Sequence, residues 1–104
     1  MNLYPYLYYG EELKEPGKVL HKLKKADKKL DAYVVLLSEN PSDQLEIRQI
    51  KDLFGKVLKS REPMSIGIGK DYDDCVKIVE RIAGECFKKN RNGNLKTYLR
   101  ERVI

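Results

Sequence analysis

Apolar residues occupy consecutive positions from Ala32 to Leu37, which is the longest such run in the chain. The polar sequence 38–41 closes the run. A strand that is apolar at every position, rather than at alternate positions, is typical of a sheet covered on both faces, as parallel sheets are. The pattern therefore predicts a buried strand at 32–37 in a parallel sheet.

The next segment has apolar residues at three- and four-residue spacing, which places them on one stripe of an amphipathic helix. These residues are Ile47, Ile50, Leu53, Phe54, Val57 and Leu58. Asn40 is a residue type that caps helices, and Pro41 suits the first helical position. The sequence thus predicts a helix from about residue 41 to Ser60, with Pro63 as the break that follows.

Residues 64–69 predict a second short strand, and Asp71 is expected to cap another helix, with Asp73 and Asp74 in its first turn. The apolar stripe of this helix is Tyr72, Cys75, Val76, Val79, Ile82, Ala83, Cys86 and Phe87. A strand, a helix and a second strand imply a right-handed parallel crossover. The expected fold class is α/β: one domain over 1–104, built on a small βαβα unit with a short parallel sheet and helices packed on it.

The remaining segments near the two ends are shorter. Residues 16–25 fit a short helix with Val19, Leu20 and Leu23 inward, or a strand with Val19, His21 and Leu23 on one face. The helix is preferred because Leu20 fits the helical pattern and not the alternating one. A short C-terminal helix is expected from Leu95, Tyr98, Leu99 and Val103.

The N-terminal segment is rich in tyrosine, with four of the seven in the chain: Tyr4, Tyr6, Tyr8 and Tyr9. One interpretation is an edge strand, where Pro5 is tolerated because outward N–H groups need no partner. The other is a surface that covers an unknown protein partner or a second copy, since tyrosine offers a large contact area at low entropic cost.

Charged residues make up 36% of the 104 residues, and 21 basic against 16 acidic side chains give a net charge of +5. Mixed signs are typical of a solvated surface, but the excess of positive charge leaves nucleic-acid binding as an alternative function. Tyrosines could then stack on bases. The candidate residues lie in two basic clusters and are Lys24, Lys25, Lys28, Lys29, Lys88, Lys89 and Arg91.

The glycine-rich sequence 67–71 joins a predicted strand to a helix, as phosphate-binding loops do. It lacks the Ser or Thr that follows the lysine of a P-loop, and Tyr72 stands where a dinucleotide loop has its third glycine. The preferred interpretation is a strand of small residues packed closely under a helix. No cofactor is expected.

Cys75 and Cys86 lie eleven residues apart on one predicted helix, so about 16 Å of rise separates them. That is too far for a disulfide, and the two are expected to be buried thiols. With His21 as the sole histidine, the usual zinc ligands are missing and no metal site is assigned. A second alternative is an enzyme that holds a divalent cation at acidic strand-end loops, using Asp71, Asp73 and Asp74 with Glu39 or Asp43.

The leading hypothesis is a non-catalytic binding or protein-interaction module. Its candidate residues are the four N-terminal tyrosines and four residues at strand ends, Ser38, Asn40, Lys70 and Asp71. No catalytic residue is assigned, because no nucleophile or acid–base pair stands out. No apolar stretch approaches the length of a membrane span and no secretory signal is evident, so a cytoplasmic location is expected.

Overall fold

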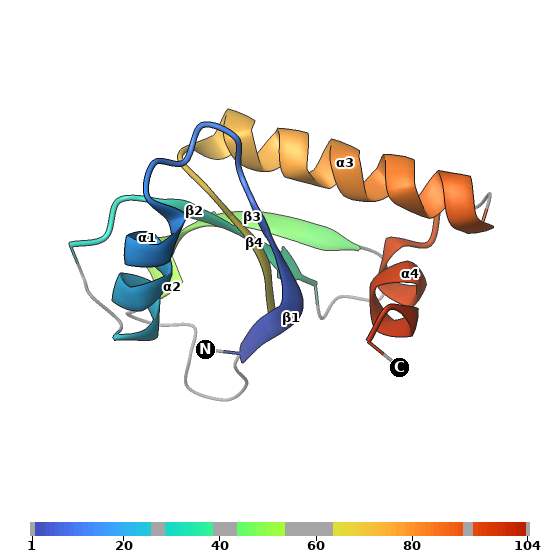
Figure 1. Cartoon of the computed structure of the whole chain (residues 1–104), viewed down its shortest axis with the longest axis horizontal. Coiled ribbons are helices and arrows are strands. Elements are labelled where there is room, and N and C mark those ends of the chain that lie inside the picture. The colour runs from blue at the N-terminus through green and yellow to red at the C-terminus, as the bar shows by residue number, and fades with distance from the viewer. Residues whose placement is uncertain (1, 26–28, 39–43, 54–63, 91–92, 104) are drawn as a thin grey trace.

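A computed structural model describes residues 2–25, 29–38, 44–53, 64–90 and 93–103 (Figure 1). Its strands and helices, in chain order, are β1 (Asn2–Tyr9), α1 (Pro16–Lys24), β2 (Tyr33–Leu37), β3 (Leu45–Gln49), α2 (Ile50–Leu53), β4 (Met64–Gly69), α3 (Tyr72–Asn90) and α4 (Leu95–Glu101). The fold is α/β, with helices packed on one sheet, as predicted. No helix within these ranges is long and apolar enough to cross a membrane.

The sheet is mixed rather than parallel. Its four strands lie in the order β1-β4-β2-β3; β1 runs parallel to β4, whereas β2 is antiparallel to both of its neighbours. The prediction of a parallel sheet around β2 was therefore wrong. The apolar run has another cause: helices cover both faces of the sheet, and burial on both sides favours apolar residues whatever the strand direction.

Of the helix predicted over 41–60, the structure describes 44–53: the prediction was wrong for 45–49, which is a strand, and is confirmed for 50–53. Leu45–Gln49 forms β3, which pairs with β2 from Leu37 opposite Leu45 to Tyr33 opposite Gln49, and helical structure begins at Ile50. The sequence of β3 alternates, with Leu45 and Ile47 partly buried against the core, and this period of two suits an edge strand. Because β3 is a strand, the expected parallel crossover does not form. The predicted cap (Asn40, Pro41) and Phe54, Val57 and Leu58 lie outside the described residues.

Other predicted elements were confirmed. These are β4, α3, and the short helices α1 and α4, and β1 forms the edge strand that was one of the two interpretations of the N-terminal segment. In the predicted stripe of α3, however, Tyr72 and Phe87 are exposed. Asp71 caps α3 as expected, because its Oδ1 accepts a hydrogen bond of 2.8 Å from the Asp74 N–H. Asn94 caps α4 in the same way and accepts from the Thr97 N–H at 3.1 Å.

The helices form two layers with the sheet between them (Figure 1). Against α3 and α4 lies a cluster that includes Tyr4, Tyr8, Val35 and Ile66. On the other face, α1 and α2 contribute to a second cluster, whose buried members are Leu23, Leu30, Ala32, Val34, Leu36, Ile50 and Ile68. Successive residues of β2 thus face different helical layers, which explains why none of them is polar.

The glycines of β4 allow α3 to approach the sheet closely. A Cβ on Gly67 would lie 3.1 Å from Ile78 Cγ2, and one on Gly69 would lie 2.7 Å from Cys75 Sγ. This geometry confirms the interpretation of small residues packed under a helix. Cys75 and Cys86 are both buried thiols, as predicted, and burial raises the pKa of Cys75 to about 12.

Candidate functional site

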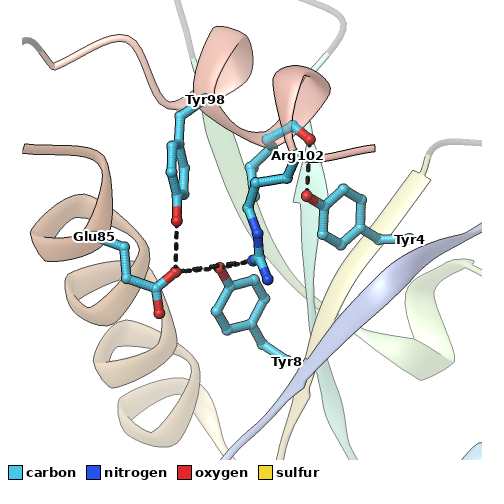
Figure 2. Close-up of polar contacts among 6 residues, drawn as sticks. Tyr4, Tyr8, Glu85, Tyr98 and Arg102 are labelled. Carbon is cyan, nitrogen blue, oxygen red and sulfur yellow. Dashed lines mark hydrogen bonds and ion pairs between the residues drawn. The ribbon is translucent and has the colours of Figure 1, made fainter. Parts of the chain in front are cut away.

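A polar network joins β1 to α3 and α4 on one side of the sheet (Figure 2). At its centre is Glu85, whose Oε1 accepts hydrogen bonds from the hydroxyls of Tyr8, at 2.5 Å, and Tyr98, at 3.0 Å. Arg102 Nη1 lies 3.8 Å from the same oxygen. One carboxylate on α3 therefore connects α3 and α4 to β1, which lies near the other end of the sequence.

The guanidinium group of Arg102 is surrounded by aromatic rings. Its Cζ lies 5.0 Å from the ring centroid of Tyr6, 5.6 Å from that of Tyr8 and 5.9 Å from that of Tyr98. Arg102 also donates a hydrogen bond to the Tyr8 hydroxyl. Contacts at these distances are in the range of cation–π attraction. They place the charge where it holds α4 against β1 (Figure 2).

The tyrosine hydroxyls of this region act as hydrogen-bond donors. Burial, followed by the hydrogen bond to Glu85, raises the pKa of Tyr8 and of Tyr98 above the ordinary value of 10.0. Burial also raises the pKa of Tyr4, whose hydroxyl donates to the Leu99 carbonyl at 2.7 Å. At neutral pH these phenols keep their protons, which suits the joining of elements rather than nucleophilic chemistry.

These shifts predict a fall in stability at alkaline pH. Because folding raises the pKa of these tyrosines above the value near 10.0 of an unfolded chain, their contribution is fully present below about pH 10 and is lost as the pH rises further. The free energy of unfolding, measured with urea, should be lower at about pH 11 than at about pH 9. The difference between the two pH values should be smaller in Tyr8→Phe than in the wild type. Tyr72→Phe is the matched control, because it removes one phenol hydroxyl at an exposed position and leaves Tyr8 in place. Equal losses in both variants would contradict the prediction.

An apolar cleft lies beside this network, between the start of β1 and α4. Its volume is about 480 Å³. It is lined by Leu3, Tyr4, Pro5, Leu37, Met64, Ile66, Leu99, Arg100 and Val103. Arg100 is the one charged residue among these, so the walls can hold an apolar group and offer a cation at one point.

The four N-terminal tyrosines have different environments. Tyr4 and Tyr8 are in the core, 3% and 7% exposed, and their hydroxyls bind within the chain. Tyr9 is half-buried against the cluster formed with α1. Tyr6 is 52% exposed, which makes it the member of the set that is available to a partner. Tyr6 lies on the same side of the sheet as Tyr4 and Tyr8, since its ring contacts Tyr4 and Arg102, but the helices cover the rings of Tyr4 and Tyr8 and leave that of Tyr6 exposed.

The predicted strand-end residues are not brought together. Because β2 and β4 are antiparallel, Ser38 at the end of β2 and Lys70 at the end of β4 lie at opposite ends of the sheet. Ser38 is buried and its hydroxyl lies 3.4 Å from Glu46 Oε1, whereas Lys70 is exposed. Asn40 lies outside the described residues. The carboxyl ends of β2 and β4 therefore do not meet at one edge, as the predicted parallel sheet required, while Glu39 and Asp43 lie outside the described residues.

The aspartates at the start of α3 have structural partners. Asp71 caps the helix, and Asp74, which is 1% exposed, accepts hydrogen bonds from the backbone N–H groups of Lys70 at 2.9 Å and Glu12 at 3.3 Å. Asp74 thereby fastens the β1–α1 loop to the start of α3. Within the described ranges, no three His, Cys, Asp or Glu side chains are placed to share a metal ion.

The two basic clusters lie in different layers. Lys24, Lys25 and Lys29 are exposed at or after the end of α1, and Lys88 and Lys89 are exposed at the end of α3. These helices cover opposite faces of the sheet, and the two ends lie far apart along the molecule (Figure 1). Lys28 and Arg91 lie outside the described residues. The described lysines thus do not form one continuous cationic surface.

Sequence reasoning did not identify Glu85, Tyr98 and Arg102 as a group, nor the cleft. The available signal was weak: Tyr98 and Arg102 are four residues apart, so they share a face of the C-terminal helix. Comparison with protein families, with curated proteins and with solved structures found no match to this chain. Its function therefore has to be inferred from its own residues.

Proposed function

We propose that the chain is a non-catalytic binding module whose site is the apolar cleft between β1 and α4. The cleft itself carries the proposal, because a volume of about 480 Å³ is in the range of sites that enclose a ligand or several side chains. Its walls combine both ends of the described chain, with Leu3 and Pro5 from β1 and Leu99 and Val103 from the C-terminal region.

The surroundings of the cleft favour a peptide segment of a partner protein as the ligand. Val103, which is 47% exposed, and Tyr6, which directly follows Pro5, extend the apolar surface beyond the cleft. Arg102 holds the Tyr6 ring from one side, so this aromatic group is presented at low entropic cost. Arg100 is positioned to bind a carboxylate. The ligand that fits is an apolar segment with an acidic residue or a terminal carboxylate nearby.

The chemistry of the neighbouring network also supports a binding role rather than catalysis. The Glu85 carboxylate, the hydroxyls of Tyr8 and Tyr98, and Arg102 hydrogen-bond or pair with one another. Groups engaged in this way rigidify the walls of a site, which lowers the cost of binding.

Selection of random displayed peptides on the wild-type protein, followed by measurement of their affinity for Val103→Glu, tests the proposal. Selected peptides should carry large apolar residues, and their affinity should fall at least about tenfold in Val103→Glu, because a carboxylate at the rim must be desolvated. Arg100→Glu should weaken those peptides that also carry an acidic group.

Phe87→Glu is the matched control, since Phe87 is 64% exposed on α3 and does not line the cleft. Circular dichroism establishes that each variant is folded. Peptides that bind Val103→Glu as tightly as the wild type, or a selection that yields none, would overturn the assignment of the cleft.

A further inference from the structure

The outer edge of β3 is the second surface that the architecture leaves for a partner. β3 ends the sheet on the side opposite β1, and its inner side pairs with β2. Within the described part of the chain, no strand pairs with its outer side. An edge strand of this kind is a template for pairing with another strand, because it carries a row of outward N–H and C=O groups.

Two hydrogen bonds identify the outward groups. The Ser38 N–H donates to the Gln44 carbonyl at 3.1 Å, and the Ile50 N–H donates to the Ala32 carbonyl at 2.9 Å. In an antiparallel ladder the bonded pairs alternate along the strand. Residues 44, 46, 48 and 50 are therefore turned toward β2, whereas the backbone groups of Leu45, Ile47 and Gln49 point outward.

The sequence of β3 is complementary to itself in the antiparallel direction. If Ile47 is placed opposite Ile47 of a second copy, Leu45 faces Gln49 and each Glu46 faces an Arg48. Opposite charges at directly facing positions stabilise a strand pair, and like charges destabilise it. A shift by two residues places Glu46 opposite Glu46 or Arg48 opposite Arg48. Charge therefore selects the register centred on Ile47.

The charged side chains of this edge are exposed enough to form ion pairs with a second copy. Glu46 and Arg48 are 36% and 56% exposed, and they pair with each other at 3.7 Å within the chain. Leu45 and Ile47 lie on the α3 side and pack against the core cluster there. A second copy would place its own Ile47 beside this one and extend the apolar cluster across the boundary.

We propose that two copies of this chain associate through β3, antiparallel about a two-fold axis centred on Ile47, so that their sheets become continuous. The other edge is less suited to this pairing. In β1, Pro5 lacks an N–H and the register with β4 shifts between Leu3 and Tyr8, features that protect an edge from strand addition. No residue of β3 lines the cleft, so the dimer can be tested separately from the proposed peptide site.

Charge reversal with rescue provides the test, with analytical ultracentrifugation over a wide range of concentration as the measurement. The wild type should sediment as a concentration-dependent dimer. Glu46→Arg and Arg48→Glu should each weaken dimerisation at least about tenfold, because each places like charges opposite one another at two positions. An equimolar mixture of these two variants, and the double variant Glu46→Arg/Arg48→Glu, should restore it.

Lys77→Glu, at an exposed position on α3, is the control for net charge, and Val103→Glu should leave the dimer intact. Amide hydrogen exchange supplies a second measurement: the N–H groups of Leu45, Ile47 and Gln49 should be protected in the dimer and exposed in Glu46→Arg. A wild type that is monomeric at every concentration would overturn the proposal. So would a wild-type dimer whose loss in the single variants is not restored by the mixture or the double variant, or a dimer in which these amides stay unprotected.

Discussion

Replacing Tyr8 with alanine is expected to lower the free energy of unfolding by about 3–5 kcal/mol, whereas the same change at Tyr6 should cost about 1 kcal/mol or less. The two residues share a strand and a face, but Tyr8 is 7% exposed and Tyr6 is 52% exposed. Loss of the Tyr8 ring leaves a cavity under α3, and loss of its hydroxyl removes a hydrogen-bond partner from both Glu85 and Arg102. Since a domain of this size is only marginally stable, Tyr8→Ala should approach complete unfolding.

Urea denaturation followed by circular dichroism measures both variants. Tyr8→Phe is the control that keeps the ring, and it should lose about 1–2 kcal/mol, because Glu85 and Arg102 each lose one partner. Comparable losses in Tyr6→Ala and Tyr8→Ala would mean that the network does not connect β1 to the helices as the structure has it.

Gly10→Ala is expected to destabilise the protein by about 3 kcal/mol. A Cβ at this position would lie 1.9 Å from Asp74 Oδ2 and 2.3 Å from its Cγ. The carboxylate cannot move away without cost, because it is buried and accepts hydrogen bonds from the N–H groups of Lys70 and Glu12. Either the side chain gives up these donors or the loop after β1 leaves the sheet.

A double-mutant cycle separates the clash from other effects of the added methyl group. In an Asp74→Ala background the obstructing atoms are gone, so Gly10→Ala should cost less than about 1 kcal/mol, which gives a coupling of about 2 kcal/mol. Gly84→Ala in α3 is the control, because a Cβ there meets nothing within 4 Å; it should stabilise the helix by about 0.5–1 kcal/mol. Additive effects of the two changes would contradict the role of Asp74.

Elements with strong local signals were predictable from the sequence. The helix α3 has a cap at Asp71 and a long apolar stripe, and both features depend on neighbours in the sequence. The segment 45–58 was ambiguous, because Ile47, Ile50 and Leu53 fit a helical stripe while Leu45 and Ile47 also fit an alternating strand. Pairing with β2 decides between the two interpretations, and this tertiary contact outweighs local spacing. The antiparallel pairing of β2 with β4 likewise differs from the parallel crossover that the helical interpretation implied.

The tyrosine–glutamate–arginine network was not predictable in the same way. The Tyr8–Glu85 hydrogen bond joins residues 77 positions apart, and Arg102 reaches Tyr8 across 94 positions. No spacing rule relates such residues, because the packing of β1 beside β4 brings them together. Composition indicated that the tyrosines were unusual, and an edge strand was one of the two interpretations of their segment. Burial of Tyr4 and Tyr8 depended on where α3 and α4 lie.

The parallel pairing of β1 with β4 also has a consequence for the order of folding. β1 is synthesised before residues 64–69, so its strand partner in the described sheet is absent when β1 is made. Contacts between distant segments form slowly, because a large loop must close first. The β2–β3 hairpin can form locally, and β4 with α3 can then add to it. We expect the nascent chain to acquire its N-terminal strand last, with the apolar side of that strand a target for chaperones until then.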